Sequence, residues 1–170
     1  VGFLFELLLD VLHQQARQWI DRGVWIRFMG HRDSLPQRLV QSMNQWQNVQ
    51  PKQRKLTLNI ALNFSGRSHL FRSFCDYMDT ITESQQPHLE GFSDYLNTQF
   101  ETSDPDLLIR TGGEMRLSNF MIWQLAWTEF YFSDMLWPDF DVQALQGAIA
   151  DYAKRQRRYG RIDSDANARA

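Results

Sequence analysis

The chain has 170 residues, of which 43% are hydrophobic, and its formal net charge at pH 7 is −2. This length suits a single domain with a hydrophobic core, and the charge excludes the broad basic field that drives nonspecific binding of nucleic acid. The one cysteine, Cys75, excludes an internal disulfide, and its place in an apolar helical pattern predicts a packed thiol.

Hydrophobic spacing in the first half of the chain alternates between the periods of helices and strands. Helical spacing continues up to Gly23, where a helix would end, and the alternation of a strand is clearest over 56–64. The predicted elements are a helix over 4–20, a strand over 24–28, a turn over 30–34, a helix over 39–46 with Pro36 in its first turn, a loop over 47–54 and a strand over 56–64.

The second half continues this alternation. The predicted elements are a helix over 70–81, a surface connection over 80–88, a short helix around 92–96, a strand over 106–109, an aromatic-rich helix after Ser118, and a helix over 142–158. Phe120, Trp123 and Trp127 have helical spacing and are predicted to lie in the core. The whole pattern predicts an α/β fold with a mainly parallel central sheet flanked by helices.

Residues 106–119 have the composition of a phosphate-binding turn. The turn combines two arginines, two adjacent glycines and a serine, which are Arg110, Arg116, Gly112, Gly113 and Ser118. The glycines allow left-handed backbone angles, and the serine can cap the helix that follows. Amides at the start of that helix and the two guanidinium groups would then converge on one anion. A second interpretation stays open, in which Arg116 is the surface ion-pair partner of Glu114.

Three stretches of the sequence carry a resemblance to one family. They are 106–140, with its run of aromatic residues after the turn, the Leu-Thr-Leu-Asn-Ile-Ala stretch at 56–61, and Arg-Arg-Tyr-Gly at 157–160. Together they resemble the cis-prenyltransferases, the undecaprenyl diphosphate synthase type of isoprenyl transferase. The resemblance implies an enzyme that condenses isopentenyl diphosphate with an allylic diphosphate. Its product would be a long polyprenyl diphosphate of the undecaprenyl type, a lipid carrier for cell-wall synthesis.

The family pattern also contains an Asp-Gly-Asn-Gly-Arg phosphate loop and a Ser-x-Glu-Asn-Trp stretch, and neither string occurs in this sequence. The resemblance therefore predicts a single isoprenyl transferase domain over 1–161, truncated at its N-terminus, and a disordered tail over 162–170. The family's catalytic aspartate and asparagine would lie in the missing segment, so we assign no catalytic residue here and expect the chain alone to be inactive. The alternative is a non-catalytic accessory subunit or an inactive fragment of such a transferase.

The resemblance also assigns binding roles. Arg110, Arg116 and Ser118, with the main chain at Leu117, would hold isopentenyl diphosphate, and Glu129 would help to bind Mg²⁺. Hard cations of this kind prefer carboxylate and phosphate oxygens. A glutamate beside aromatic residues can instead be the buried partner of an arginine, and both interpretations of Glu129 stay open.

A basic cluster over 154–158 closes the predicted last helix. In the family, an Arg-x-Gly near the C-terminus reaches the isopentenyl site of the neighbouring subunit, and Arg158-Tyr159-Gly160 matches it, which implies a homodimer with shared active sites. A solvated helix end that is favoured by the helix dipole also explains the cluster. The predicted partners are thus the two diphosphates and a second copy of the chain, without nucleic acid. We expect a cytoplasmic protein with at most peripheral membrane association.

Overall fold

The computed structural model describes residues 2–82, 85–101 and 103–157 of the chain. The predicted tail over 162–170 and the Arg158-Tyr159-Gly160 motif lie outside these residues. The chain divides into two compact units, residues 1–102 and 103–170, and each is described by itself.

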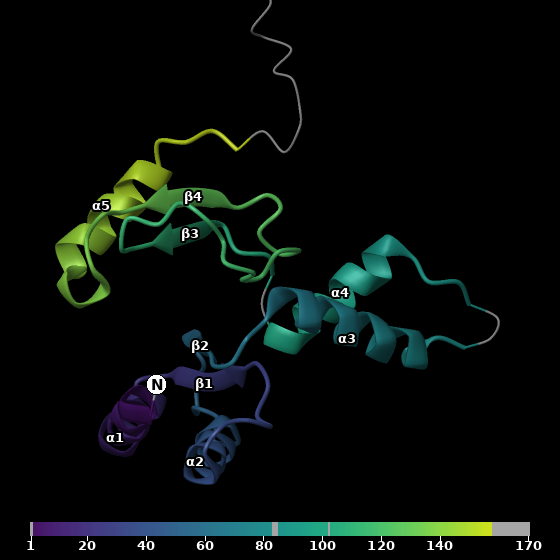
Figure 1. The fold of residues 1–170 in the computed structure, drawn as a ribbon, viewed down its shortest axis with the longest axis horizontal. Coiled ribbons are helices and arrows are strands. Elements are labelled where there is room, and N and C mark those ends of the chain that lie inside the picture. The colour runs from purple at the N-terminus through teal and green to yellow at the C-terminus, as the bar shows by residue number, and fades with distance from the viewer. Residues whose placement is uncertain (1, 83–84, 102, 158–170) are drawn as a thin grey trace, which may run out of the picture. The chain divides into compact units, whose positions relative to one another are not determined.

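The first unit is a parallel pair of strands with four helices (Figure 1). Its elements are α1 Gly2–Asp21, β1 Val24–Met29, α2 Gln37–Gln47, β2 Leu56–Ala61, α3 Gly66–Thr80 and α4 Leu89–Phe100. The register of the two strands runs from Val24 beside Leu56 to Met29 beside Ala61. All six elements had been predicted from hydrophobic spacing, with boundaries that differ by a few residues.

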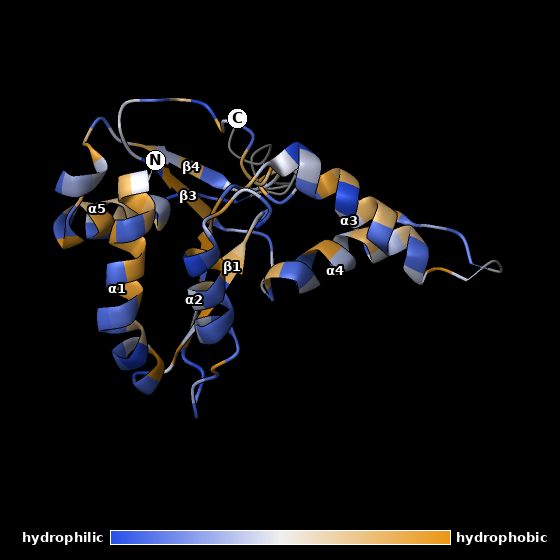
Figure 2. Cartoon of the chain, turned by 60° about the horizontal axis from the view of Figure 1, so that its bottom comes forward, coloured by the Kyte–Doolittle hydropathy of each residue, from blue (hydrophilic) through white to orange (hydrophobic). Residues whose placement is uncertain are grey.

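Helix α1 shows why the spacing was informative. Its buried residues are Leu9, Leu12, Ala16 and Ile20, which recur every three or four positions and so share one side of the helix. Apolar residues gather along one side of α1 and polar residues along the other (Figure 2). The apolar side packs against Ile26 of β1, which is fully buried, so the core of this unit lies between α1 and the strands.

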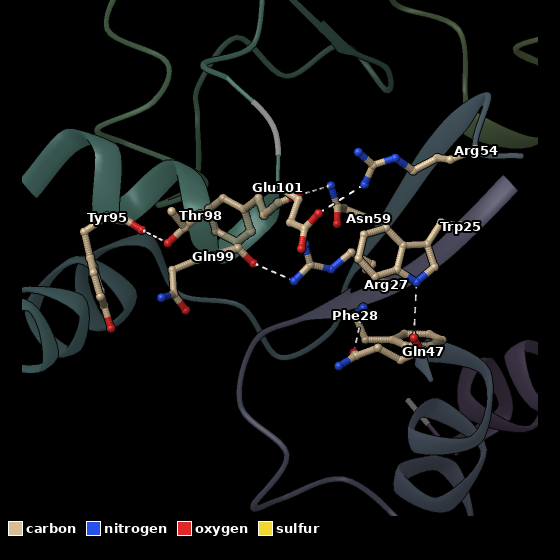
Figure 3. A network of polar contacts seen from close by, with 11 residues as sticks. Trp25, Arg27, Phe28, Gln47, Arg54, Asn59, Tyr95, Thr98, Gln99 and Glu101 are labelled. Atoms are coloured by element: carbon tan, nitrogen blue, oxygen red, sulfur yellow. Dashed lines mark hydrogen bonds and ion pairs between the residues drawn. The ribbon is translucent and has the colours of Figure 1, made fainter. Parts of the chain in front are cut away.

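A polar network joins the end of α4 to the strand β1 within this unit (Figure 3). Arg27 of β1 donates a hydrogen bond of 3.2 Å to the carbonyl of Gln99, one of the carbonyls that a helix end leaves without a helical partner. Glu101 follows α4 in a left-handed conformation and forms ion pairs of 3.7 Å with Arg27 and 3.1 Å with Arg54. Both guanidinium groups also lie over the ring of Trp25, at 4.9 and 5.3 Å from its centroid.

The second unit contains a second parallel pair of strands. Its elements are β3 Leu107–Arg110, β4 Glu129–Phe132, the short 3₁₀ helix η1 Trp137–Asp139 and α5 Val142–Tyr152. Leu107 lies beside Glu129 and Arg110 beside Phe132. Asp141 caps α5 by accepting a hydrogen bond of 2.9 Å from the amide of Ala144.

The predicted aromatic-rich helix after Ser118 is wrong. Residues 118–127 form a series of turns, and β4, which was not predicted, follows them. The reason is local, because Ser118, Asn119 and Met121 have left-handed φ angles of 47°, 63° and 42°, which interrupt an α-helix. Ser118 therefore caps no helix. The Glu-Phe-Tyr-Phe sequence of β4 is rich in strand-forming aromatic residues, a signal that the helical spacing of the preceding aromatics had obscured.

Three smaller predictions also differ from the structure. Helix α5 ends at Tyr152 and not at residue 158. Cys75 is exposed and not packed, and Trp127, predicted to lie in the core, is 59% exposed. Among the described helices, none combines the length and apolar character that crossing a membrane requires.

Candidate functional site

The two glycines of the predicted phosphate turn follow β3 after one intervening residue, Thr111. Gly112 and Gly113 have φ angles of +84° and +74°, the left-handed region that side chains with a Cβ avoid. The amide of Gly112 donates to the carbonyl of Met135 at 2.8 Å, and the amide of Gly113 donates to the carbonyl of Ser133 at 3.0 Å. The turn is therefore fixed to the segment that follows β4, at the carboxyl ends of both strands.

Arg110 organises the rest of the loop. It is the last residue of β3, and its Nη1 atom donates hydrogen bonds to the main-chain carbonyl of Arg116 and, at 3.1 Å, to the hydroxyl of Ser118. Arg110, Ser118 and the main chain between them are thus brought together, but the predicted helix start that would supply amides is absent, because residues 118–127 form turns. The side chain of Arg116 forms an ion pair with Glu114 and is 64% exposed. Of the two interpretations of Arg116, the surface ion pair is the arrangement in the structure.

A cavity of about 350 Å³ opens beside this loop. It is lined by the two arginines together with apolar residues of β3 and of the turns that follow: Pro105, Leu107, Leu108, Ile109, Leu117, Phe120, Met121 and Leu125. Apolar walls with a few polar groups at one side are the usual construction of a small-molecule site. The arrangement could therefore hold a ligand that combines an anionic head with a short hydrocarbon part.

Glu129 lies apart from this loop. It is the first residue of β4 and lies beside Leu107, whereas Arg110 is three residues further along β3. Three residues of strand correspond to about 10 Å, and because side chains alternate along a strand, the two residues point to opposite faces. The structure thus does not bring Glu129 to the arginines of the predicted anion site.

Glu129 is instead the partner of Arg155. The Nη1 atom of Arg155 lies 3.1 Å from Oε2 of Glu129 and donates a 2.8 Å hydrogen bond to the carbonyl of Phe130. Its Nη2 atom lies 2.6 Å from Oδ2 of Asp151. Hydrogen bonds to Asp151 and then to Glu129 raise the pKa of Arg155 above its ordinary value. Of the two interpretations of Glu129, the pairing with an arginine is what the described residues show.

Arg157, the next arginine after α5, also contacts the strand pair. Arg157 forms an ion pair with Asp106, and its Nη2 atom donates to the carbonyl of Trp127 at 3.2 Å. Arg155 and Arg157 are therefore folded back onto the strands, and the alternative explanation of a solvated helix end does not describe these two arginines. Asp151, four residues before Arg155, was the one sequence signal that could have indicated a pairing.

The described residues contain no group of three or more His, Cys, Asp or Glu side chains that could hold a metal ion. Glu129 offers one hard oxygen donor. Magnesium is commonly held by one or two carboxylates together with substrate phosphates and water, so a single glutamate suits such an ion when the other ligands come with the substrate.

Comparison with known proteins decides the family. The model of the family described as "Putative undecaprenyl diphosphate synthase" matches residues 1–160 of the chain. The chain belongs to this family. The predicted resemblance is confirmed, and with it the predicted enzyme class, because curated members that match the chain carry the name isoprenyl transferase.

Three similar proteins illustrate the match. The isoprenyl transferase of Aquifex aeolicus is 39% identical over 164 residues, which is 95% of this chain and 69% of the relative. The ditrans,polycis-undecaprenyl-diphosphate synthase ((2E,6E)-farnesyl-diphosphate specific) of Legionella pneumophila is 35% identical over 166 residues, which is 95% of this chain and 69% of the relative. The crystal structure of lavandulyl diphosphate synthase from Lavandula x intermedia, in complex with dimethylallyl diphosphate, matches with a TM-score of 0.85 at 28% identity. That match covers 95% of this chain and 71% of the other and confirms the α/β fold.

Proposed function

We propose that the protein serves cis-prenyl chain elongation, in which isopentenyl diphosphate is joined to an allylic diphosphate to build a long polyprenyl diphosphate of the undecaprenyl type. The observation that carries the proposal is Arg110, which ties the loop over 116–118 beside an apolar cavity that Arg116 also lines. Family membership supports the reaction class. The predicted site residues, Arg110, Arg116, Leu117 and Ser118, remain a proposal that this geometry favours.

In this reaction the carbon–oxygen bond of the allylic diphosphate breaks, and diphosphate leaves with the electron pair. The double bond of isopentenyl diphosphate forms the new carbon–carbon bond, and a proton is lost to give the cis product. The protein must therefore hold the isopentenyl group close to the developing cation. Arg110 would fix the loop, Arg116 would leave Glu114 to bind the diphosphate of the donor, and the apolar walls would enclose its hydrocarbon part.

The proposal includes a magnesium ion, which Glu129 would help to bind. When bound, the ion would supply charge stabilisation to diphosphate oxygens. Because Glu129 and Arg110 lie on opposite faces and at opposite ends of the strand pair, the two residues would not serve the same diphosphate within one chain. This separation supports the proposed homodimer with shared sites, in which a carboxylate of one subunit would act beside the diphosphates of the other.

Titration calorimetry with isopentenyl diphosphate tests the binding step. We expect Arg110→Gln and Arg116→Gln to weaken binding by about 10- to 100-fold, because each removes a charge-assisted hydrogen bond. Arg17→Gln is a matched control, since Arg17 forms an exposed i,i+4 ion pair with Asp21 on α1. We also expect isopentenyl diphosphate to bind more tightly than inorganic diphosphate. Equal affinities for all variants would exclude the arginine loop as the donor site.

A turnover assay separates the enzyme from its alternative. With radiolabelled isopentenyl diphosphate and (2E,6E)-farnesyl diphosphate, the primer in the name of the Legionella relative, we expect donor binding without turnover by these 170 residues. Failure to bind the donor would favour the accessory subunit. Full turnover would show that the expected inactivity of the chain alone is wrong.

A further inference from the structure

We propose that Arg155 is a positioning residue for Glu129. The inference rests on the proposed role of Glu129 in magnesium binding and adds to it a residue that holds the carboxylate in place. Arg155 follows α5, whereas Glu129 opens β4, so one guanidinium group connects the end of the helix to the start of the strand.

The guanidinium group is fixed from two sides. Asp151 of α5 accepts from both Nε and Nη2 through its Oδ2 atom, at 3.1 and 2.6 Å. Nη1 then donates to the main-chain carbonyl of Phe130 at 2.8 Å and to Glu129 at 3.1 Å. Because Asp151 and the Phe130 carbonyl determine where the guanidinium group lies, the guanidinium group in turn determines where the carboxylate of Glu129 lies.

The contact uses one carboxylate oxygen of Glu129. Arg155 binds Oε2. In this proposal, Oε1 is the atom that would face a metal ion. Outer contacts of this kind orient ligating carboxylates in metalloproteins, and their loss typically weakens metal binding by about 10- to 100-fold. The side chains of Arg155 and Glu129 are 29% and 30% exposed, so the pair is partly shielded and yet open to a ligand.

The charges of the cluster are compatible with a cation. A positive group beside a metal ligand would by itself repel the metal ion. Asp151 offsets this charge, since the two carboxylates and the one guanidinium group sum to −1. Arg155 can therefore orient Glu129 without cancelling the negative charge that a divalent cation needs.

Arg157 provides a matched control for a purely structural role. It lies two residues after Arg155 and also ties this segment to the strand pair, but through Asp106 and the carbonyl of Trp127. If Arg155 only attaches the segment to the strands, loss of either arginine should have the same effect. If Arg155 positions Glu129, only its own loss should change metal binding.

Binding of Mn²⁺, a paramagnetic substitute for Mg²⁺, tests the inference by electron paramagnetic resonance. The 170-residue protein is saturated with isopentenyl diphosphate, and the signal of manganese with isopentenyl diphosphate alone is subtracted. We expect Arg155→Gln to weaken Mn²⁺ binding by about 10- to 100-fold, and Arg157→Gln to change it less than about twofold. Arg155→Lys keeps the charge but loses the fork that reaches several acceptors, so we expect an intermediate loss.

Glu129→Gln distinguishes failure of the inference from failure of the proposed function. Unchanged Mn²⁺ binding in that variant would remove the metal role of Glu129 and the positioning role with it. Weak binding in Glu129→Gln, together with normal binding in Arg155→Gln, would overturn the positioning role alone. Equal losses in the Arg155 and Arg157 variants would also overturn it. Should Arg155→Gln fail to fold, normal binding by Arg155→Lys would count against the inference in the same way.

Discussion

Arg110 and Ser118 are joined by a hydrogen bond of 3.1 Å that closes the loop after β3, and the serine holds its place with a left-handed φ of 47°. The side chain and the backbone of Ser118 therefore have opposite effects. The hydroxyl stabilises the position of Arg110, whereas the left-handed conformation is unfavourable for any residue with a Cβ by about 1–2 kcal/mol.

Two variants at this position separate these effects. We expect both Ser118→Ala and Ser118→Gly to weaken binding of isopentenyl diphosphate, each by about fivefold, which corresponds to the loss of about 1 kcal/mol from one hydrogen bond. Ser118→Gly should be the more stable protein of the two by about 1 kcal/mol, because glycine adopts this φ without strain. Calorimetry and urea unfolding measure the two quantities. Equal unfolding midpoints would show that the backbone at Ser118 is not strained.

A pair of glycine substitutions tests the turn itself. Gly112 has a φ of +84°, and a Cβ added there would meet nothing within 4 Å, so its only penalty is conformational. We expect Gly112→Ala to lower the free energy of unfolding by about 1–2 kcal/mol. Gly147 lies within α5 with the same open surroundings and without a positive φ. There, Gly147→Ala should raise the free energy of unfolding by about 0.5–1 kcal/mol. Urea unfolding of both variants measures the contrast, and the same sign for both would contradict it.

The elements with strong hydrophobic periods could be predicted from the sequence, and the local exceptions could not. In α1, buried residues recur at every turn of the helix, and the alternation over 56–61 marks β2 equally clearly. After Ser118, helical spacing of aromatic residues gave the wrong element, because spacing contains no information about φ angles at individual residues. Ser118, Asn119 and Met121 adopt left-handed backbone conformations, and none of these residue types requires such a conformation.

The candidate site could be predicted only in part, because the sequence indicates contacts between near neighbours but not contacts that depend on packing. Arg110 and Ser118 come together because they are close in the sequence and one turn connects them. The pairing of Glu129 with Arg155 joins residues 26 apart and depends on how α5 packs against β4. The family resemblance implied a metal ion as the partner of Glu129, and its aromatic neighbours suggested an arginine instead; only the fold identifies which arginine is near.

In the network at the end of α4, we expect substitutions of the two arginines to destabilise the protein unequally. The side chain of Arg27 is 18% exposed and binds the carbonyl of Gln99, whereas the side chain of Arg54 is 51% exposed. We expect Arg27→Leu to lower the free energy of unfolding by about 2 kcal/mol, because the hydrogen bond to the helix end comes from a charged and mostly buried guanidinium group. Arg54→Leu should change it by less than about 1 kcal/mol, since exposed ion pairs are weak. Urea unfolding of both variants tests the difference, and equal losses would argue against a larger contribution from the buried guanidinium group.

His69 predicts how stability depends on pH. Burial and, to a smaller extent, the charge of His31 lower the pKa of His69 below its ordinary value. Its ring lies between Phe64 and Phe100, with centroids at 5.4 and 4.9 Å, and its Nε2 atom is buried without a hydrogen-bond partner among the described residues. The unfolded chain therefore binds a proton at this position more readily than the folded protein does. The stability gained by keeping His69 neutral is fully present above about pH 6.5, the ordinary pKa of histidine in an unfolded chain. It is lost progressively as the pH falls below that value.

Replacement of His69 by phenylalanine should remove this dependence. Phenylalanine keeps an aromatic ring between its two neighbours and has no nitrogen to protonate, so we expect the variant to lose less stability than the natural protein between pH 7 and pH 5. The difference in slope should be at most that of one proton. His13→Gln is the control, because His13 is exposed on α1. Urea unfolding at a series of pH values measures the slopes. Parallel curves for His69→Phe and the natural protein would show that folding does not disfavour the protonated ring.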